Sequence, residues 1–218
     1  MKILLVGASG MVGQGVLREC LAAPDVEAVI SLVRTASGTS HPKLRELVLA
    51  DFHGLAALEP ALQGLSACFY CAGVSSFRMS EAAYTAITYD LTLEVARHLV
   101  SWNPGLTLTY VSGAGTDSSE QGASMWARVK GRTENSLLAL PCRGFMFRPG
   151  IIRPVDGIVS KTPAYRFLYA LLSPVTPILE RALPRFVTNT RQLGRAMLTV
   201  VRHGAATRVL ETRDINAL

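Results

Sequence analysis

Three glycines near the start of the chain constrain its fold more than any other feature. Gly7, Gly10 and Gly13 stand in the segment Gly-Ala-Ser-Gly-Met-Val-Gly, directly after the apolar run 3–6. Apolar residues at helical spacing follow the glycines, and a second apolar run covers residues 26–33. Strand, helix and strand in so short a segment form the βαβ unit of a parallel sheet.

The same alternation of apolar runs and amphipathic segments continues to residue 148. Strands are predicted at 3–6, 26–33, 47–49, 67–71, 106–112 and 144–148, and helices at 11–21, 55–62, 80–102 and 121–140. This order predicts the α/β class, with a Rossmann-type doubly wound parallel sheet that binds its ligand at the carboxyl ends of the strands.

The sequence pattern changes after Pro149: prolines become frequent and the regular alternation of strands and helices ends. Short helices are predicted at 164–172, 178–182 and 191–202, as a small C-terminal helical cap. We therefore expect a single NAD(P)-binding domain over residues 1–218, with 150–190 as its substrate-side cap. The apolar segment 165–185 is expected to cover a pocket or form a subunit contact, as in a homodimer; peripheral contact with a membrane is the alternative.

The glycine loop has the spacing that a dinucleotide pyrophosphate requires. A glycine at position 7 permits the tight turn out of the strand, Gly10 allows the backbone to approach the phosphates, and Gly13 lets the helix pack closely. The helix N-terminus behind the loop offers free N–H groups and a partial positive charge. The predicted cofactor contacts in this loop are Gly7, Ser9, Gly10, Met11, Val12 and Gly13.

The residue after the second strand indicates which dinucleotide is bound. A site for NAD carries Asp or Glu there to bind the ribose 2′-hydroxyl, whereas a site for NADP carries a positive group. Here Arg34 follows Val33, so the sequence favours NADP, with NAD as the alternative cofactor. Further contacts are expected from Asp51 and Phe52 beside the adenine, and from Ala72 and Gly73 beside the adenine ribose.

The composition of the chain indicates which kinds of partner it binds and in which cell compartment it lies. The formal net charge is +6, but the arginines are scattered and do not form the clustered basic face of a nucleic-acid-binding protein. No apolar stretch has the length of a transmembrane helix, and the first residues lack the pattern of a signal peptide. We expect a cytoplasmic protein that acts on a small-molecule substrate and does not bind nucleic acid.

The cysteines and histidines do not form a metal site by their spacing. Cys68 and Cys71 make a C-x-x-C pair, but in a strand they point to opposite faces, so we interpret them as small hydrophobic residues. The four histidines lack carboxylate partners at metal spacing, and no metal is predicted: His41, His53, His98 and His203.

The motifs together resemble the atypical or extended short-chain dehydrogenase/reductase superfamily, close to its NAD-dependent epimerase/dehydratase-like and NmrA-like members. The resemblance spans about residues 1–155 and depends on the glycine loop and on Asp51, Cys71-Ala72-Gly73, Ser112, Lys130 and Arg148-Pro149-Gly150. It implies a nicotinamide cofactor, with Arg148 and Pro149 among the residues that contact it.

The resemblance also implies a catalytic trio of Ser, Tyr and Lys, with the tyrosine four residues before the lysine. Ser112 matches the serine, which orients the substrate oxygen, and Lys130 matches the lysine, which binds the nicotinamide ribose. Trp126 stands where the tyrosine is expected. Its indole N–H can donate a hydrogen bond but does not release a proton near neutral pH.

Two explanations remain for the missing tyrosine. Either the protein is an NADP(H)-dependent oxidoreductase whose proton comes from solvent, as in the reduction of quinones, flavins or conjugated alkenes, or it is a regulatory or scaffold protein that senses NADP(H) without turnover. A third possibility is that the hydroxyl of Tyr110 or Ser124 replaces that of the missing tyrosine. The family's helix asparagine is also absent, and Asp90 is near its expected place.

Overall fold

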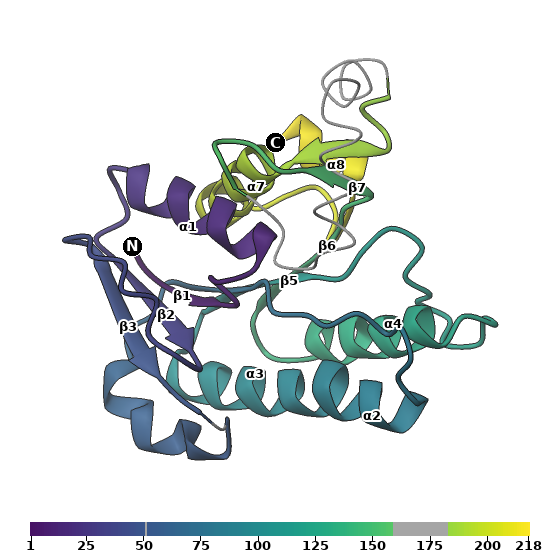
Figure 1. Cartoon of the computed structure of the whole chain (residues 1–218), viewed down its shortest axis with the longest axis horizontal. Coiled ribbons are helices and arrows are strands. Elements are labelled where there is room, and N and C mark those ends of the chain that lie inside the picture. Colours follow the sequence, from purple (N-terminus) through teal and green to yellow (C-terminus); the bar gives the residue numbers. More distant parts are fainter. Residues whose placement is uncertain (51, 159–182) are drawn as a thin grey trace.

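Seven strands form one parallel sheet in the computed structural model, which describes residues 1–50, 52–158 and 183–218 (Figure 1). The strand order is β3-β2-β1-β4-β5-β6-β9. After β1 the chain adds β2 and β3 toward one edge of the sheet, then places β4 on the other side of β1 and continues toward the opposite edge. Ligands of such sheets bind at this reversal, between β1 and β4. The bounds are β1 Lys2–Val6, β2 Ala28–Val33, β3 Leu44–Val48, β4 Ala67–Tyr70, β5 Thr107–Val111, β6 Arg143–Arg148 and β9 Val209–Glu211.

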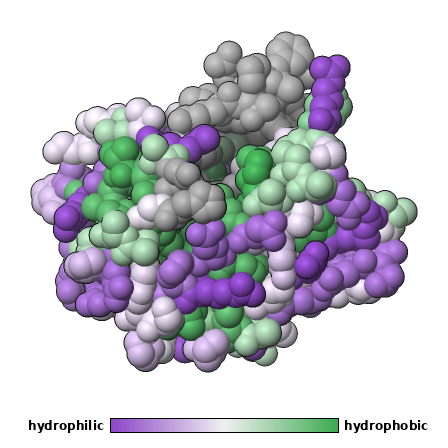
Figure 2. Space-filling model, turned by 90° about the horizontal axis from the view of Figure 1, so that it is seen from below, coloured by the Kyte–Doolittle hydropathy of each residue, from purple (hydrophilic) through white to green (hydrophobic). Residues whose placement is uncertain are grey.

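Helices cover both faces of the sheet (Figure 1). One layer contains α1 Met11–Ala22, α7 Thr190–His203 and α8 Thr212–Ala217. The opposite layer contains η1 Phe52–Ala61, α2 Glu81–Thr85, η2 Ala86–Asp90, α3 Leu91–Trp102 and α4 Met125–Leu138. Seen from the side of α3 and α4, hydrophilic residues cover most of the surface and hydrophobic ones lie between them (Figure 2).

Each strand supplies both hydrophobic cores, because its side chains alternate between the two faces. In β1, Ile3 and Leu5 pack toward α1 and α7, whereas Leu4 and Val6 pack toward η1, α3 and α4. Burial on both sides explains why β1, β2 and β4 are nearly continuous apolar runs in the sequence. The predicted Rossmann-type parallel sheet is confirmed.

The C-terminal part of the chain contains elements that the sequence pattern did not reveal. β7, Ile151–Arg153, pairs in parallel with β8, Val187–Asn189, and β9 completes the main sheet beside β6. These strands have three residues each, too few for a period of two to be recognised. Their pairing is decided by partners far away in the sequence.

Three predicted helices differ in the structure. The one predicted at 55–62 is the 3-10 helix η1, Phe52–Ala61. The helix predicted at 80–102 is divided by the π-helical turn η2, where Leu91 N–H donates to Ala86 O. The helix predicted at 121–140 begins only at Met125, because the Asp117 carboxylate accepts hydrogen bonds from the backbone N–H groups of Ser119 and Gly122 and holds the preceding segment as a loop.

Several predictions fall outside the described residues. These are the helices at 164–172 and 178–182, most of the cap 150–190 and of the apolar segment 165–185, Asp51, and the side chain of Phe52. In the parts of the chain that are described, no helix has the length and hydrophobicity needed to cross a bilayer. Placement in the cytoplasm stays a prediction.

Candidate functional site

The glycine loop connects the end of β1 to α1 and lies directly against the end of β4. Gly7 has φ of +91°, a conformation that L side chains rarely adopt. A Cβ atom at Gly7 would lie 2.5 Å from the backbone nitrogen of Ala72, in the turn after β4. Two independent reasons therefore require a glycine at this position: the backbone conformation and the lack of room for a side chain.

Gly13 and Gly10 complete a compact loop at the N-terminus of α1. A Cβ atom at Gly13 would lie 2.1 Å from the carbonyl oxygen of Gly7, so the first turn of the helix rests on the loop itself. Gly10 is the N-cap of α1 and donates its N–H to Gly7 O at 3.0 Å. No side chain caps this helix and its first turn contains no acidic residue.

This helix terminus suits an anionic ligand. The N–H groups of the first helical residues, Met11, Val12 and Gly13, have no partner within the helix. They carry the positive end of the helix dipole, and Ser9 lies beside them in the loop. The loop therefore fits the pyrophosphate of a dinucleotide, as predicted from its glycines.

A cavity of about 380 Å³ adjoins the glycine loop between α1, β2 and β3. Arg34 lies exposed at its wall, at the end of β2. The lining residues are Ala8, Ser9, Gln14, Leu17, Val33, Arg34, Thr35, Ser37, Thr39 and Glu46. Arg34 is thus beside the loop that would hold the phosphates, and its contact with a cofactor stays a prediction.

Glu46 is the one carboxylate among the residues that line this cavity, and sequence reasoning missed it. It lies on β3, which pairs with β2, and accepts hydrogen bonds from Ser37 N–H at 2.9 Å and Ser37 Oγ–H at 2.6 Å. These two bonds leave acceptor sites on the carboxylate, so Glu46 keeps its negative charge at the wall. Arg34 is the one positively charged residue among those that line the cavity, and so the one suited to a ligand phosphate.

Ser112 and Lys130 meet at the end of β5. The Lys130 ammonium donates to the carbonyl oxygens of Ser112, at 2.8 Å, and of Val111, at 3.3 Å. Its nitrogen also lies 5.5 Å from the centre of the Tyr110 ring. Burial lowers the pKa of Lys130 from 10.5 to about 8, although the negative charge of Glu134 acts in the opposite direction.

A fully buried carboxylate, Glu134, lies behind Ser112. Its Oε1 accepts the Ser112 hydroxyl at 2.5 Å, and both of its oxygens accept from Arg148 Nε at 3.1 Å. Arg148 Nη2 completes the ion pair with Glu134 and also donates to Ser118 Oγ at 2.5 Å. Arg148 Nη1 contacts Glu211 at 3.4 Å.

Glu134 was not among the residues predicted from the sequence, although one signal was present. Glu134 follows Lys130 by four residues, so on a helix the two lie on the same face. Arg148, predicted to contact the cofactor, directs most of its donors to Glu134, Ser118 and Glu211 within the chain. Its cofactor contact stays a prediction, as does that of Pro149, whose carbonyl accepts from Ala114 N–H at 2.9 Å.

The aromatic residues of the region do not replace the missing tyrosine. Trp126 is half-buried on α4, and a Cβ atom at Gly115 would lie 3.6 Å from its ring. Tyr110 is only 1% exposed, and burial raises the pKa of its phenol well above the usual value. The hypothesis that Tyr110 supplies the acid is therefore wrong, because its hydroxyl lies inside the core.

The remaining predicted residues have less defined surroundings. Ala72 lies against Gly7, and a Cβ atom at Gly73 would meet no atom within 4 Å, so this turn is open to a ligand. Ser124 is exposed at the N-cap of α4 and makes no capping bond. Whether these residues contact a cofactor stays a prediction.

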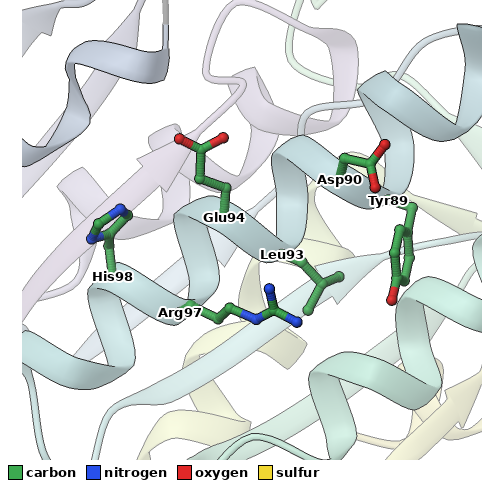
Figure 3. A pocket seen from close by; sticks show the side chains of 6 residues that line it. All are labelled: Tyr89, Asp90, Leu93, Glu94, Arg97 and His98. Atoms are coloured by element: carbon green, nitrogen blue, oxygen red, sulfur yellow. The ribbon is translucent and has the colours of Figure 1, made fainter.

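A second hollow, of about 420 Å³, lies along η2 and α3 (Figure 3). Its lining side chains are Tyr89, Asp90, Leu93, Glu94, Arg97 and His98. Asp90, which was expected near the family's helix asparagine, therefore lines an outer groove of the helix. Because this groove includes no residue from the carboxyl end of a strand, the site at the glycine loop is the candidate.

Comparison with known proteins supports the fold. The family model "NAD dependent epimerase/dehydratase family" matches residues 3–122. The protein fmp52-1, mitochondrial, of Aspergillus terreus is 29% identical over 164 residues, which cover 69% of this chain and 66% of that protein, slightly less than two thirds of its length.

Solved structures of low sequence identity share the same architecture. The enzyme WbmH of Bordetella bronchiseptica in complex with NAD⁺ superposes with a TM-score of 0.68 at 16% identity, covering 96% of this chain and 74% of that chain. A short-chain dehydrogenase/reductase superfamily protein of Agrobacterium tumefaciens with bound NAD gives 0.68 at 15% identity, covering 96% and 76%. With its glycine loop, its strand order and a family match over more than half of its residues, the chain belongs to the NAD-dependent epimerase/dehydratase family.

Proposed function

We propose that this protein binds NADP(H) at the glycine loop and uses it in the oxidation or reduction of a small organic molecule. The observation that carries the proposal is the cradle at the N-terminus of α1. Cβ atoms at Gly7 and Gly13 would overlap the backbone that forms it, its helix end is uncapped, and Arg34 lies beside it. The structural neighbours named above bind NAD, and the choice of NADP rests on Arg34.

Different residues of the chain would bind different parts of the cofactor. The first N–H groups of α1 hold the pyrophosphate, and Arg34 pairs with the 2′-phosphate. Lys130, with one N–H left beyond its two bonds to carbonyls, binds the nicotinamide ribose. When bound, the nicotinamide supplies or accepts a hydride. Because Trp126 does not exchange a proton, the proton of the reaction comes from solvent.

Replacing Arg34 with glutamate tests the choice of cofactor. We expect the Kd for NADPH to rise on the order of 100-fold, because an attractive charge-assisted bond becomes a repulsion. The Kd for NADH should change less than about threefold, since NADH lacks the 2′-phosphate. Titration calorimetry measures both. R45E is the control, an equal charge change on the neighbouring strand outside the cavity; equal losses for NADPH and NADH would place Arg34 away from the phosphate.

The affinity for NADPH should depend on pH through Lys130. The ammonium form, which donates to the ribose, is present below its pKa of about 8 and is lost as the pH rises through that value. We expect affinity to fall between about pH 7.5 and 9, above the range in which a phosphate titrates. The K130M variant should bind more weakly and lose this step. K43M, at a half-buried lysine before β3 that donates to Ala23 O at 2.7 Å, should keep it. A step that persists in K130M contradicts the assignment.

A regulatory protein that senses NADP(H) is the second candidate, favoured by Trp126 at the position of the family's tyrosine. A panel of quinones, flavins and enones, followed by NADPH absorbance, separates the two functions. The enzyme should oxidise NADPH with at least one acceptor at a rate above the protein-free background. Binding of NADPH without turnover of any acceptor would support the regulatory role instead.

A further inference from the structure

The Ser112 hydroxyl has one hydrogen to donate, and two acceptor atoms of the protein lie within hydrogen-bond distance of it. Glu134 Oε1 lies 2.5 Å from its oxygen, and the carbonyl oxygen of Phe147 lies 3.1 Å away. The backbone N–H of Ser112 donates to the same carbonyl at 2.9 Å, which holds the residue in place at the end of β5. The side of Ser112 that is not covered by these contacts is partly exposed.

The ion pair behind Ser112 decides where that hydrogen lies. Glu134 is 0% exposed, and a carboxylate buried so completely is ionised only with a partner such as Arg148, which donates to both of its oxygens. An ionised carboxylate only accepts hydrogen bonds, so the Ser112 hydrogen points to Glu134. Were Glu134 protonated, it would donate to Ser112 Oγ, and the serine hydrogen would be released to turn to Phe147 O or to a ligand. The serine is therefore an acceptor only while Glu134 is ionised.

We propose that Glu134 is a positioning residue of this site, which takes the Ser112 hydrogen and presents the serine to a bound substrate as a hydrogen-bond acceptor only. The site then selects a substrate with a hydroxyl or N–H group at this point, and Ser112 offers no donor to a bare carbonyl. The inference rests on the proposed function, because the ligand in question is the substrate beside the cofactor.

The E134Q variant should reverse the polarity of Ser112 with little change in shape. The Arg148 Nε and Nη2 donors would hold the amide oxygen, which leaves the amide NH₂ group toward Ser112 Oγ. The amide then donates to the serine, whose own hydrogen becomes available for a ligand. E211Q is the matched control, since Glu211 contacts Arg148 at 3.4 Å but not Ser112.

A first experiment needs no ligand. The hydroxyl hydrogen shared by Ser112 and Glu134 should give a slowly exchanging, downfield proton resonance in the NMR spectrum. It should be absent in E134Q and in S112A and present in E211Q. Absence of such a resonance from the wild-type protein, or its survival in E134Q, would overturn the proposal.

A second experiment compares phenol with anisole on the NADP⁺-loaded protein by ligand-observed NMR titration; only phenol carries an O–H group, and neither is a hydride donor. Phenol should bind about fivefold more tightly than anisole, as one hydrogen bond implies. The ratio should fall to about one in E134Q and in S112A, which serves if E134Q does not fold, and stay in E211Q. Equal binding in the wild type, or an unchanged ratio in E134Q, overturns the inference. Failure of NADPH to bind at all would refute the proposed function, while the proton resonance still decides the position of the hydrogen.

Discussion

Removing the buried carboxylate with E134A is expected to lower the free energy of unfolding by about 3–5 kcal/mol, the usual cost of leaving one partner of a buried ion pair alone. The Arg148 side chain is 11% exposed and would lose its bonds to Glu134 while staying charged, because a guanidinium does not deprotonate in proteins. In the intact protein, burial lowers the pKa of Arg148, but the bonds to Glu134 and Glu211 outweigh it and raise the pKa. Urea denaturation followed by circular dichroism measures the change. In a domain of this size the melting temperature should fall by about 10 °C.

Two further variants separate the ion pair from a general effect of substitution. E211A removes the other acid that contacts Arg148, but Glu211 is 51% exposed, so the loss of this ion pair should stay below about 1 kcal/mol. Glu211 also caps α8 with its side chain, so E211Q, which keeps a capping oxygen, is measured beside E211A. The double variant E134L/R148M removes both buried charges and should recover much of the stability. If E134A were as stable as E211A, Glu134 would not be the main partner of Arg148.

The G13A variant is expected to raise the Kd for NADPH by at least about 100-fold, or about 2.7 kcal/mol. Its new Cβ would lie 2.1 Å from Gly7 O and 2.9 Å from Ala8 Cα, both backbone atoms that cannot turn aside as a side chain can. The loop must open to relieve the overlap, which should also cost about 1–3 kcal/mol of stability. Calorimetric titration and urea denaturation measure the two effects.

The same substitution at Gly10 serves as the control for stability. A Cβ there would be 3.4 Å from Gly7 O, so G10A should fold with nearly unchanged stability. Any loss of NADPH affinity in G10A would then come from the ligand, as expected if the pyrophosphate approaches this residue closely. Normal NADPH binding by G13A would show that the loop does not hold the phosphates.

The sheet and the glycine loop were predictable because their signals are local. Strands buried on both faces are continuous apolar runs, and the spacing of Gly7, Gly10 and Gly13 reflects contacts within one turn. β7, β8 and β9 escaped prediction because three residues carry no readable period. The start of α4 was misplaced because Asp117 offers the backbone an alternative to the helix.

The fold class, the place of the cofactor loop and the residue types at the candidate site depend on spacing along the chain, so they could be predicted without a structure. The direction of the Ser112 hydrogen, the burial of Glu134 and the contacts of Arg148 could not. Those contacts join residues 14–63 positions apart, on β5, α4, β6 and the edge of the sheet. Which donor bonds to which acceptor depends on how these elements pack, and this cannot be inferred from a local pattern in the sequence.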